Sequence, residues 1–166
     1  MSYKKFVFNN LPESLNEFSA LIGDRKDPFN IATLYILALA TYMNDSALSL
    51  RMINALKGPE SLSDFEKSFI KGVLTDEPYL PLSFFEGATP DNGYTAPLPL
   101  VIKAYETEDS DRLSPNGFKS IYFKSSGAEI KRAIRVRCIE STGTWYYWQQ
   151  YIMDGIRRPK NLGKWS

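Results

Sequence analysis

Carboxylates are the side chains best able to carry out catalysis in this 166-residue chain, which contains no histidine and one cysteine. A Ser-His-Asp relay, a Cys-His relay and a histidine-ligated metal site cannot be built from this chain alone. Two carboxylates suffice for glycoside hydrolysis. Glu86 and Asp91 are the candidate catalytic pair, because Phe85 and Tyr94 nearby could stack on a sugar ring. Since carboxylates are common in loops, we favour a non-catalytic interpretation and keep a small-molecule hydrolase, possibly carbohydrate-active, as an alternative.

Neither a phosphate-binding glycine loop nor a metal-binding motif occurs in the sequence. The densest acidic run, Glu106 to Asp111, lacks the spacing and the glycine of an EF-hand loop, so we expect a solvated acidic loop. The single thiol, Cys138, alternates with Ile134 and Val136 on a predicted strand. We therefore expect it in the core and not as a nucleophile. We predict no metal site and no cofactor.

Arginines and aromatic rings provide binding chemistry near the C-terminus. Arg135 and Arg137 share one face of a predicted strand, Trp148 lies in the next strand, and Arg157 follows it. Rings interleaved with arginines can stack bases and hold phosphates, which makes nucleic-acid binding a further alternative function. The arginines can equally stack on the rings within the sheet. We favour this structural interpretation, because the glycine and aromatic signature of RNA-recognition strands is absent.

The charge is unevenly distributed, although the net charge is only +1. Residues 1–117 carry 10 Lys and Arg against 16 Asp and Glu, a balance of −6, whereas residues 118–166 carry 10 against 3, a balance of +7. A basic C-terminal region could attract an anionic or protein partner. The favoured alternative is that this region docks on the acidic half of the same chain or forms a solvated face.

A polar, glycine-containing loop from Gly87 to Thr95 is a second candidate binding region. It lies between predicted helices and predicted strands, where ligand clefts often form. Asn92 and Tyr94 are its candidate contact residues. A structural role for the loop is the favoured alternative.

Four short helices are predicted in the first half of the chain. The segments Ser14 to Glu17 and Ser63 to Glu66 have the spacing of a capping box, and Asp27 before Pro28 is a further helix start. The helix after Pro28 is apolar on nearly every side and should be the central core helix. In the fourth helix we expect the apolar residues to face inward, namely Phe65, Phe69, Ile70, Val73 and Leu74.

Strands are predicted after a proline-rich and aromatic-rich connector, in which neither helix nor sheet is expected. The four candidates span residues 100–105, 118–124, 133–139 and 144–151, and short turns between the last three predict an antiparallel meander. Strict alternation in the last strand assigns large side chains to both faces. One face carries Trp145, Tyr147, Gln149 and Tyr151, and the other carries Tyr146, Trp148, Gln150 and Ile152.

These elements predict an α+β fold in a single domain over residues 1–166, with an N-terminal lobe of about four helices packed on a C-terminal four-stranded, mainly antiparallel sheet. The helical lobe covers residues 11–75, the connector 76–99 and the β-sheet lobe 100–160. No apolar stretch approaches the roughly 20 residues of a membrane span, and the N-terminus lacks the apolar run of a signal peptide. A lone cysteine forms no internal disulfide, so we expect a soluble, cytoplasmic protein.

Six short blocks run in order along nearly the whole chain. They are Leu11-Pro12-Glu13-Ser14-Leu15 with Glu17-Phe18, Lys26-Asp27-Pro28-Phe29, Leu56-Lys57-Gly58-Pro59, Gly87-Ala88-Thr89-Pro90 with Asn92 and Tyr94-Thr95, Ser125-Ser126-Gly127-Ala128, and Ile156-Arg157 with Pro159. On these blocks the chain resembles an uncharacterised bacterial domain family of unknown function, found mostly in Firmicutes. The resemblance implies one full-length domain and no established activity. The family pattern has an acid where this chain has Gln149 and another at Gly155, so this member lacks any function those acids carry.

The available side chains favour recognition over catalysis. We predict a non-catalytic cytoplasmic binding or protein-interaction domain whose partner and oligomeric state the sequence does not specify. The candidate partner-binding residues are Asn92, Tyr94, Arg135, Arg137, Trp148 and Arg157.

Overall fold

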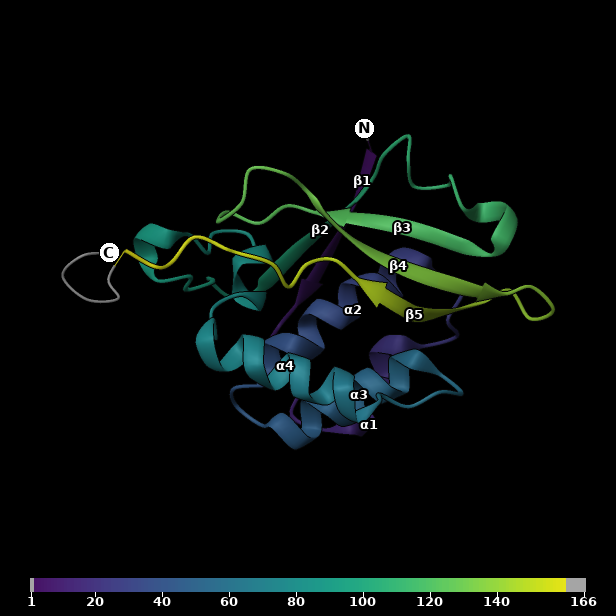
Figure 1. The fold of residues 1–166 in the computed structure, drawn as a ribbon, viewed down its shortest axis with the longest axis horizontal. Helices are drawn as coiled ribbons and strands as arrows, with labels where there is room; N and C mark the ends of the chain where they lie inside the picture. Colours follow the sequence, from purple (N-terminus) through teal and green to yellow (C-terminus); the bar gives the residue numbers. More distant parts are fainter. Residues whose placement is uncertain (1, 161–166) are drawn as a thin grey trace.

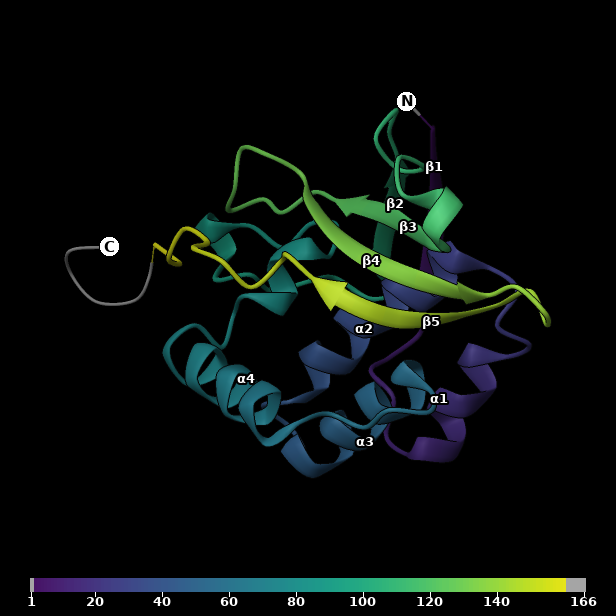
Figure 2. The ribbon, with the colours of Figure 1, turned by 45° about the vertical axis from the view of Figure 1, so that its right-hand side comes forward.

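A five-stranded antiparallel sheet lies over four α-helices in the computed structural model, which describes residues 2–160 (Figures 1 and 2). The strands are neighbours in space in the same order as in the chain. Short connections join the last three strands, which confirms the predicted meander. The strands are β1 (Ser2–Phe8), β2 (Leu100–Glu106), β3 (Phe118–Phe123), β4 (Arg132–Ile139) and β5 (Thr144–Gln150).

The helices cover one face of the sheet and leave the other bare (Figure 2). They are α1 (Leu15–Ile22), α2 (Pro28–Thr41), α3 (Ser46–Lys57) and α4 (Asp64–Asp76). In α2 every residue except Pro28 and Asn30 is buried, which confirms the predicted central core helix. Apolar side chains of the helices and of the inner sheet face form one continuous hydrophobic core. None of the helices within residues 2–160 is long and apolar enough to cross a membrane.

The helix starts follow the predicted capping chemistry. At α4 the capping box is complete, since Ser63 Oγ accepts from the Glu66 amide at 3.1 Å and Glu66 Oε1 accepts from the Ser63 amide at 3.2 Å. At α1 the Ser14 hydroxyl accepts from the Glu17 amide, whereas the Glu17 carboxylate reaches the amide of Glu13. These side chains satisfy amides that have no partner within the helix.

The α+β class and the four helices are confirmed, but the sheet has five strands where four were predicted. The additional strand is β1, which pairs with β2 along its full length, from Ser2 opposite Glu106 to Phe8 opposite Leu100. Its partner lies far along the chain, so no short-range turn signal marks the pairing. By contrast, β2 and β3 pair at a single position, Tyr105 opposite Tyr122.

The connector between α4 and β2 contains only two short 3₁₀ turns, η1 (Pro81–Phe84) and η2 (Pro90–Asn92). Its aromatic residues Tyr79, Phe84 and Phe85 are buried in the core. The prediction of a connector without regular helix or strand is therefore confirmed.

Two predictions about side-chain direction are wrong. Phe65 and Phe69 do not face inward on α4, because their side chains are 80% and 41% exposed. In β5, strict alternation fails because a register shift lies opposite Arg135 and Val136. Tyr147 pairs with Val136 while Gln149 pairs with Arg135, so the two residues do not share a face.

Candidate functional site

The bare face of the sheet, here called the outer face, brings together aromatic and cationic side chains from all five strands. The alternation that buries Ile102, Ile121 and Val136 on the inner face turns their neighbours outward. The outer face carries Tyr3, Lys103, Tyr105, Phe118, Tyr122, Arg135, Arg137, Trp148 and Tyr151. The structure thus joins three of the predicted site residues, Arg135, Arg137 and Trp148.

Arg137 packs against two neighbouring aromatic rings, those of Phe118 and Trp148. Its guanidinium carbon is 4.9 Å from the centroid of the Trp148 ring and 5.5 Å from that of Phe118. The two rings approach each other to 5.7 Å in a tilted arrangement. Such cation–π contacts hold a guanidinium in place while its N–H groups stay open to solvent.

Arg135 has unused hydrogen-bonding capacity on the same face. Its guanidinium donates to Gln149 Oε1 at 3.3 Å and lies 5.4 Å from the centroid of the Tyr151 ring. Its Nε is buried and has no hydrogen-bond partner within the described part of the chain. Gln149 also accepts from the Tyr151 hydroxyl at 3.0 Å. Gln149 is therefore an uncharged acceptor beside Arg135.

Lysines extend the cationic surface toward β1 and β2. Lys103 lies 5.0 Å from the Tyr3 ring centroid, and Lys124 and Lys131 lie 4.7 Å and 5.4 Å from that of Tyr105. Lys103 also forms an ion pair with Glu86 at 3.2 Å. The hydrogen bond from Lys103 to Glu86 raises the pKa of Lys103, so this lysine stays cationic at neutral pH.

The acidic half of the chain neutralises only part of the basic C-terminal region. Lys119 pairs with Glu106 and Asp111, each at 3.0 Å, and Lys160 pairs with Asp91 at 2.6 Å. No ion pair joins Arg135 or Arg137 to a carboxylate within residues 2–160. Docking on the chain's own acidic residues therefore accounts for Lys119 and Lys160 but not for the two outer-face arginines.

Asn92 closes the Gly87 to Thr95 loop on itself. Its Oδ1 accepts from the amides of Thr89 and Thr95 at 2.9 and 3.1 Å, and its Nδ2 donates to the carbonyls of Gly87 and Thr95. Tyr94 is 1% exposed, and its hydroxyl donates to the Arg157 carbonyl at 2.5 Å. Hydrogen bonds within the protein engage the polar side-chain atoms of both residues. A partner-binding role for Asn92 and Tyr94 stays a prediction.

Arg157 lies away from the other arginines, at the junction of this loop with the Ser125 to Ala128 turn. Its amide donates to the Gly127 carbonyl at 2.9 Å, and its exposed side chain reaches the same carbonyl with Nε at 3.4 Å. Ser126 Oγ donates to the Ala88 carbonyl at 2.6 Å in the same region. Three of the sequence blocks thus pack against one another, and Arg157 belongs to this junction and not to the outer face.

Glu86 and Asp91 form ion pairs with different lysines. Glu86 pairs with Lys103 and borders a depression of about 440 Å³ in which it is the lining carboxylate. Asp91 pairs with Lys160 instead and is not among the residues of that depression. A catalytic role for these carboxylates stays a prediction.

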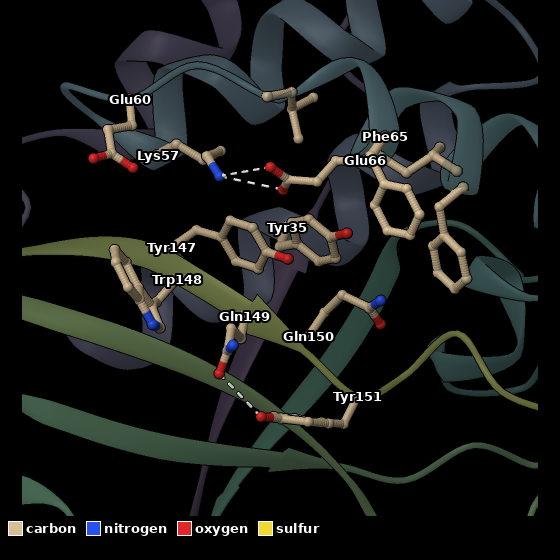
Figure 3. Close-up of a pocket in the computed structure, with 13 residues that line it drawn as sticks. Tyr35, Lys57, Glu60, Phe65, Glu66, Tyr147, Trp148, Gln149, Gln150 and Tyr151 are labelled. Carbon is tan, nitrogen blue, oxygen red and sulfur yellow. Dashed lines mark hydrogen bonds and ion pairs between the residues drawn. The ribbon is translucent and has the colours of Figure 1, made fainter.

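A second open region, here called the edge cleft, lies between β5 and α4 and has a volume of about 500 Å³ (Figure 3). Consecutive residues of the last strand, from Tyr147 to Tyr151, form one side. Phe65, Phe69 and Ile70 of α4 form the other, and Tyr35 of α2 lies at the base. The sequence did not indicate this cleft, although exposed phenylalanines four residues apart on one helix would have been its signal.

Tyr35 and Tyr147 stack at the base of the edge cleft, with ring centroids 4.1 Å apart and an interplanar angle of 8°. Burial raises the pKa of both hydroxyls far above the usual value for tyrosine. Both therefore remain protonated donors at neutral pH. Above them, Lys57 pairs with Glu66 at 3.2 Å, as the dashed lines in Figure 3 show.

The fold and these two surfaces define the class of this protein, an α+β domain in which helices cover one face of an antiparallel meander and leave the other face and one strand edge open. The chain belongs to the family described as Domain of unknown function (DUF6935), whose model matches residues 10–160. The resemblance to an uncharacterised family is thereby confirmed, whereas a bacterial origin stays a prediction. No curated protein and no solved structure matched the chain.

Proposed function

We propose that this domain is a non-catalytic binding module whose outer face binds an acidic segment of a partner protein. The observation that carries the proposal is the packing of Arg137 against Phe118 and Trp148, on a sheet face that no helix covers. A guanidinium held by ring contacts still presents N–H groups, which match the two oxygens of a carboxylate.

The charges of the outer face support an anionic partner. Neither Arg135 nor Arg137 forms an ion pair with a carboxylate among the described residues. Trp148 and Tyr151 are 37% and 50% exposed next to these arginines, which gives a partner apolar area as well as charge.

Single-stranded nucleic acid is the second candidate partner, because exposed rings beside arginines also suit base stacking. The aromatic rings of the outer face already stack with cations, which leaves less ring surface for bases and favours the acidic protein segment. We expect the domain to work in the reducing cytoplasm, since Cys138 has no second cysteine with which to form a disulfide.

Fluorescence anisotropy with a labelled polyglutamate peptide at low salt tests the proposal. We expect binding to the wild-type chain and a loss of affinity of about tenfold or more in the double variant Arg135→Glu with Arg137→Glu, because two charge-assisted contacts are removed. The melting temperature of the variant should change little, since both side chains lie on the bare face.

The matched control reverses the charge of two exposed lysines of α4 in the variant Lys67→Glu with Lys71→Glu. It changes the net charge by the same amount but leaves the outer face unaltered. An equal loss of affinity in this control would show that net charge alone drives binding and would refute the outer face as the site. Tighter binding of a labelled oligothymidylate than of polyglutamate would favour the nucleic-acid alternative.

A further inference from the structure

The free edge of β5 has backbone groups available for pairing. The amide of Cys138 donates to the Gly117 carbonyl, so alternation directs the backbone groups of Val136 toward β3 as well. Tyr147, which lies opposite Val136, then has its N–H and C=O directed away from β4. No backbone group outside the sheet bonds to them within residues 2–160. An unpaired strand edge is a template for an additional strand.

Arg25 marks one end of this free edge. The Trp145 amide donates to the Arg25 carbonyl at 2.8 Å, and the Arg25 guanidinium donates to the Trp145 carbonyl at 3.3 Å. Arg25 also bonds to carbonyls at the end of α3 and stacks on Tyr146 at 4.4 Å. Trp145 therefore already has its edge partners, whereas the edge at Tyr147 opens into the cleft.

Opposite the free edge, α4 presents apolar side chains that nothing in the described structure covers. Phe65 and Phe69 are one helical turn apart, and both line the edge cleft. The helices α2 and α3 pack against β5, but α4 does not pack closely on it. The gap between α4 and β5 thus has an unpaired backbone on one side and exposed rings on the other (Figure 3).

The charged groups of the edge cleft favour a cationic occupant. Three ionic side chains line it, namely Lys57, Glu60 and Glu66. Lys57 and Glu66 neutralise each other, and Glu60 forms no ion pair with any of the described residues. The lining therefore carries one net negative charge, opposite in sign to the outer face.

The Gln150 side chain offers a hydrogen-bond donor that suits a carbonyl group of a peptide. Its side-chain oxygen Oε1 accepts from the amides of Ile152 and Met153 at 2.9 and 3.0 Å, which directs its amide nitrogen away from these bonds. The stacked rings of Tyr35 and Tyr147 lie beside it (Figure 3).

We propose that the edge cleft binds an extended peptide segment, with alternating apolar side chains and one basic residue, as a sixth strand on the free edge of β5. Its backbone pairs with Tyr147, its apolar side chains pack on Phe65 and Phe69, and its basic residue lies near Glu60. This is the strand-addition mode of recognition, in which backbone bonds supply affinity and side-chain pockets supply specificity.

A single strand fits this position better than a second copy of the chain. An added strand would lie about 4.8 Å from β5, on the side where α4 does not pack closely against it. A second folded sheet would bring its own helical layer against α4, and the pairing available to it would end at Trp145, where Arg25 occupies the edge. The proposal is independent of the function proposed for the outer face.

Selection from a random peptide library displayed on phage, with the full chain immobilised, provides the test. We expect enriched peptides with alternating apolar residues and a lysine or arginine. Calorimetry with the synthesised peptides should show a loss of affinity of about tenfold or more when alternate backbone amides are methylated, because each methyl group removes a donor. Hydrogen exchange at the Tyr147 amide should slow in the complex.

Variants of the cleft locate the binding. Phe65→Ser with Phe69→Ser should weaken binding about tenfold or more, and Glu60→Lys should weaken basic peptides specifically. Met43→Ser, which alters an exposed apolar residue outside the cleft, should have no effect, and neither should Arg135→Glu with Arg137→Glu. All these residues are exposed or on the bare sheet face, and the melting temperature of each variant verifies folding.

Several outcomes would overturn the proposal. One is a selection that enriches no peptide, and another is binding that withstands both amide methylation and the Glu60→Lys change. A third is a selection that yields only acidic peptides whose binding is lost in the variant Arg135→Glu with Arg137→Glu, because such peptides would bind the outer face and not the edge cleft. The two proposals can be separated, because polyglutamate binding tests the outer face and binding of the selected peptides tests the edge cleft, and either result can be positive without the other.

Discussion

Gly127 is the residue at which three segments of the chain converge. A Cβ atom placed there would collide with the Tyr94 hydroxyl, lie 2.5 Å from Ile156 Cγ2 and 3.1 Å from the Arg157 amide nitrogen. The Gly127 carbonyl also accepts from that amide. The glycine is therefore required by close packing.

Replacing Gly127 with alanine should lower the free energy of unfolding by about 1–3 kcal/mol, because the added methyl group overpacks a buried junction. Urea denaturation followed by circular dichroism measures the change. Gly72 is the matched control, since it lies within α4 and a Cβ there meets no atom within 4 Å. Gly72→Ala should raise stability by about 0.5–1 kcal/mol through helix propensity. Equal effects at both glycines would contradict the packing argument.

Among the elements, β1 has the least local support and the most consequential pairing. It pairs with β2 along the full length of that strand. Its Phe8 side chain is buried on the inner face, where Phe6 also packs against the core. The family match begins at residue 10, so β1 precedes the matched range. Since β2 meets β3 at one paired position, β1 supplies most of the strand pairing of β2.

Deleting residues 2–8 should lower the free energy of unfolding by about 3 kcal/mol or more, since two phenylalanine side chains lose their buried contacts. It should also expose the edge of β2 and promote self-association, which size-exclusion chromatography measures. Val7→Ser is the control, because Val7 points to the outer face and is half exposed. A deletion variant that stays monomeric with wild-type stability would show that β1 is dispensable.

At the scale of the whole molecule, the stacked pair Tyr35 and Tyr147 joins the central helix to the last strand. Burial raises the pKa of both hydroxyls in the folded state above the usual tyrosine value of about 10. Above pH 10 the unfolded chain releases these protons while the folded chain keeps them. The unfolded state then binds fewer protons, so stability falls as pH rises.

The double variant Tyr35→Phe with Tyr147→Phe should therefore lose stability less steeply than the wild type above pH 10. Each tyrosine contributes a slope of up to about 1.4 kcal/mol per pH unit. Urea denaturation from neutral pH to about pH 11 measures the two slopes. The comparison uses slopes and not absolute values, because the substitutions also alter stability at neutral pH. Parallel curves for the two proteins would mean that the buried hydroxyls ionise as readily in the folded chain as in the unfolded chain.

The sequence determined those features that depend on neighbours along the chain. The helix caps at Ser63 and Asp27, the wholly buried helix after Pro28 and the turns of the last three strands were predictable because their bonds join residues a few positions apart. Membership of an uncharacterised family could also be predicted, and the family model matches residues 10–160. The different lysine partners of Glu86 and Asp91 were not predictable, because each lysine comes from another part of the chain.

The tertiary structure alone decided which faces are covered. The periodicity of α4 marks an apolar side but does not specify what packs on it, and Phe65 and Phe69 remain exposed because α4 does not pack closely on β5. The register shift in β5 separates Tyr147 from Gln149, and the pairing of β1 depends on a distant strand. Both candidate sites arise from these long-range arrangements, because a bare face and a free edge are defined by the elements that do not cover them.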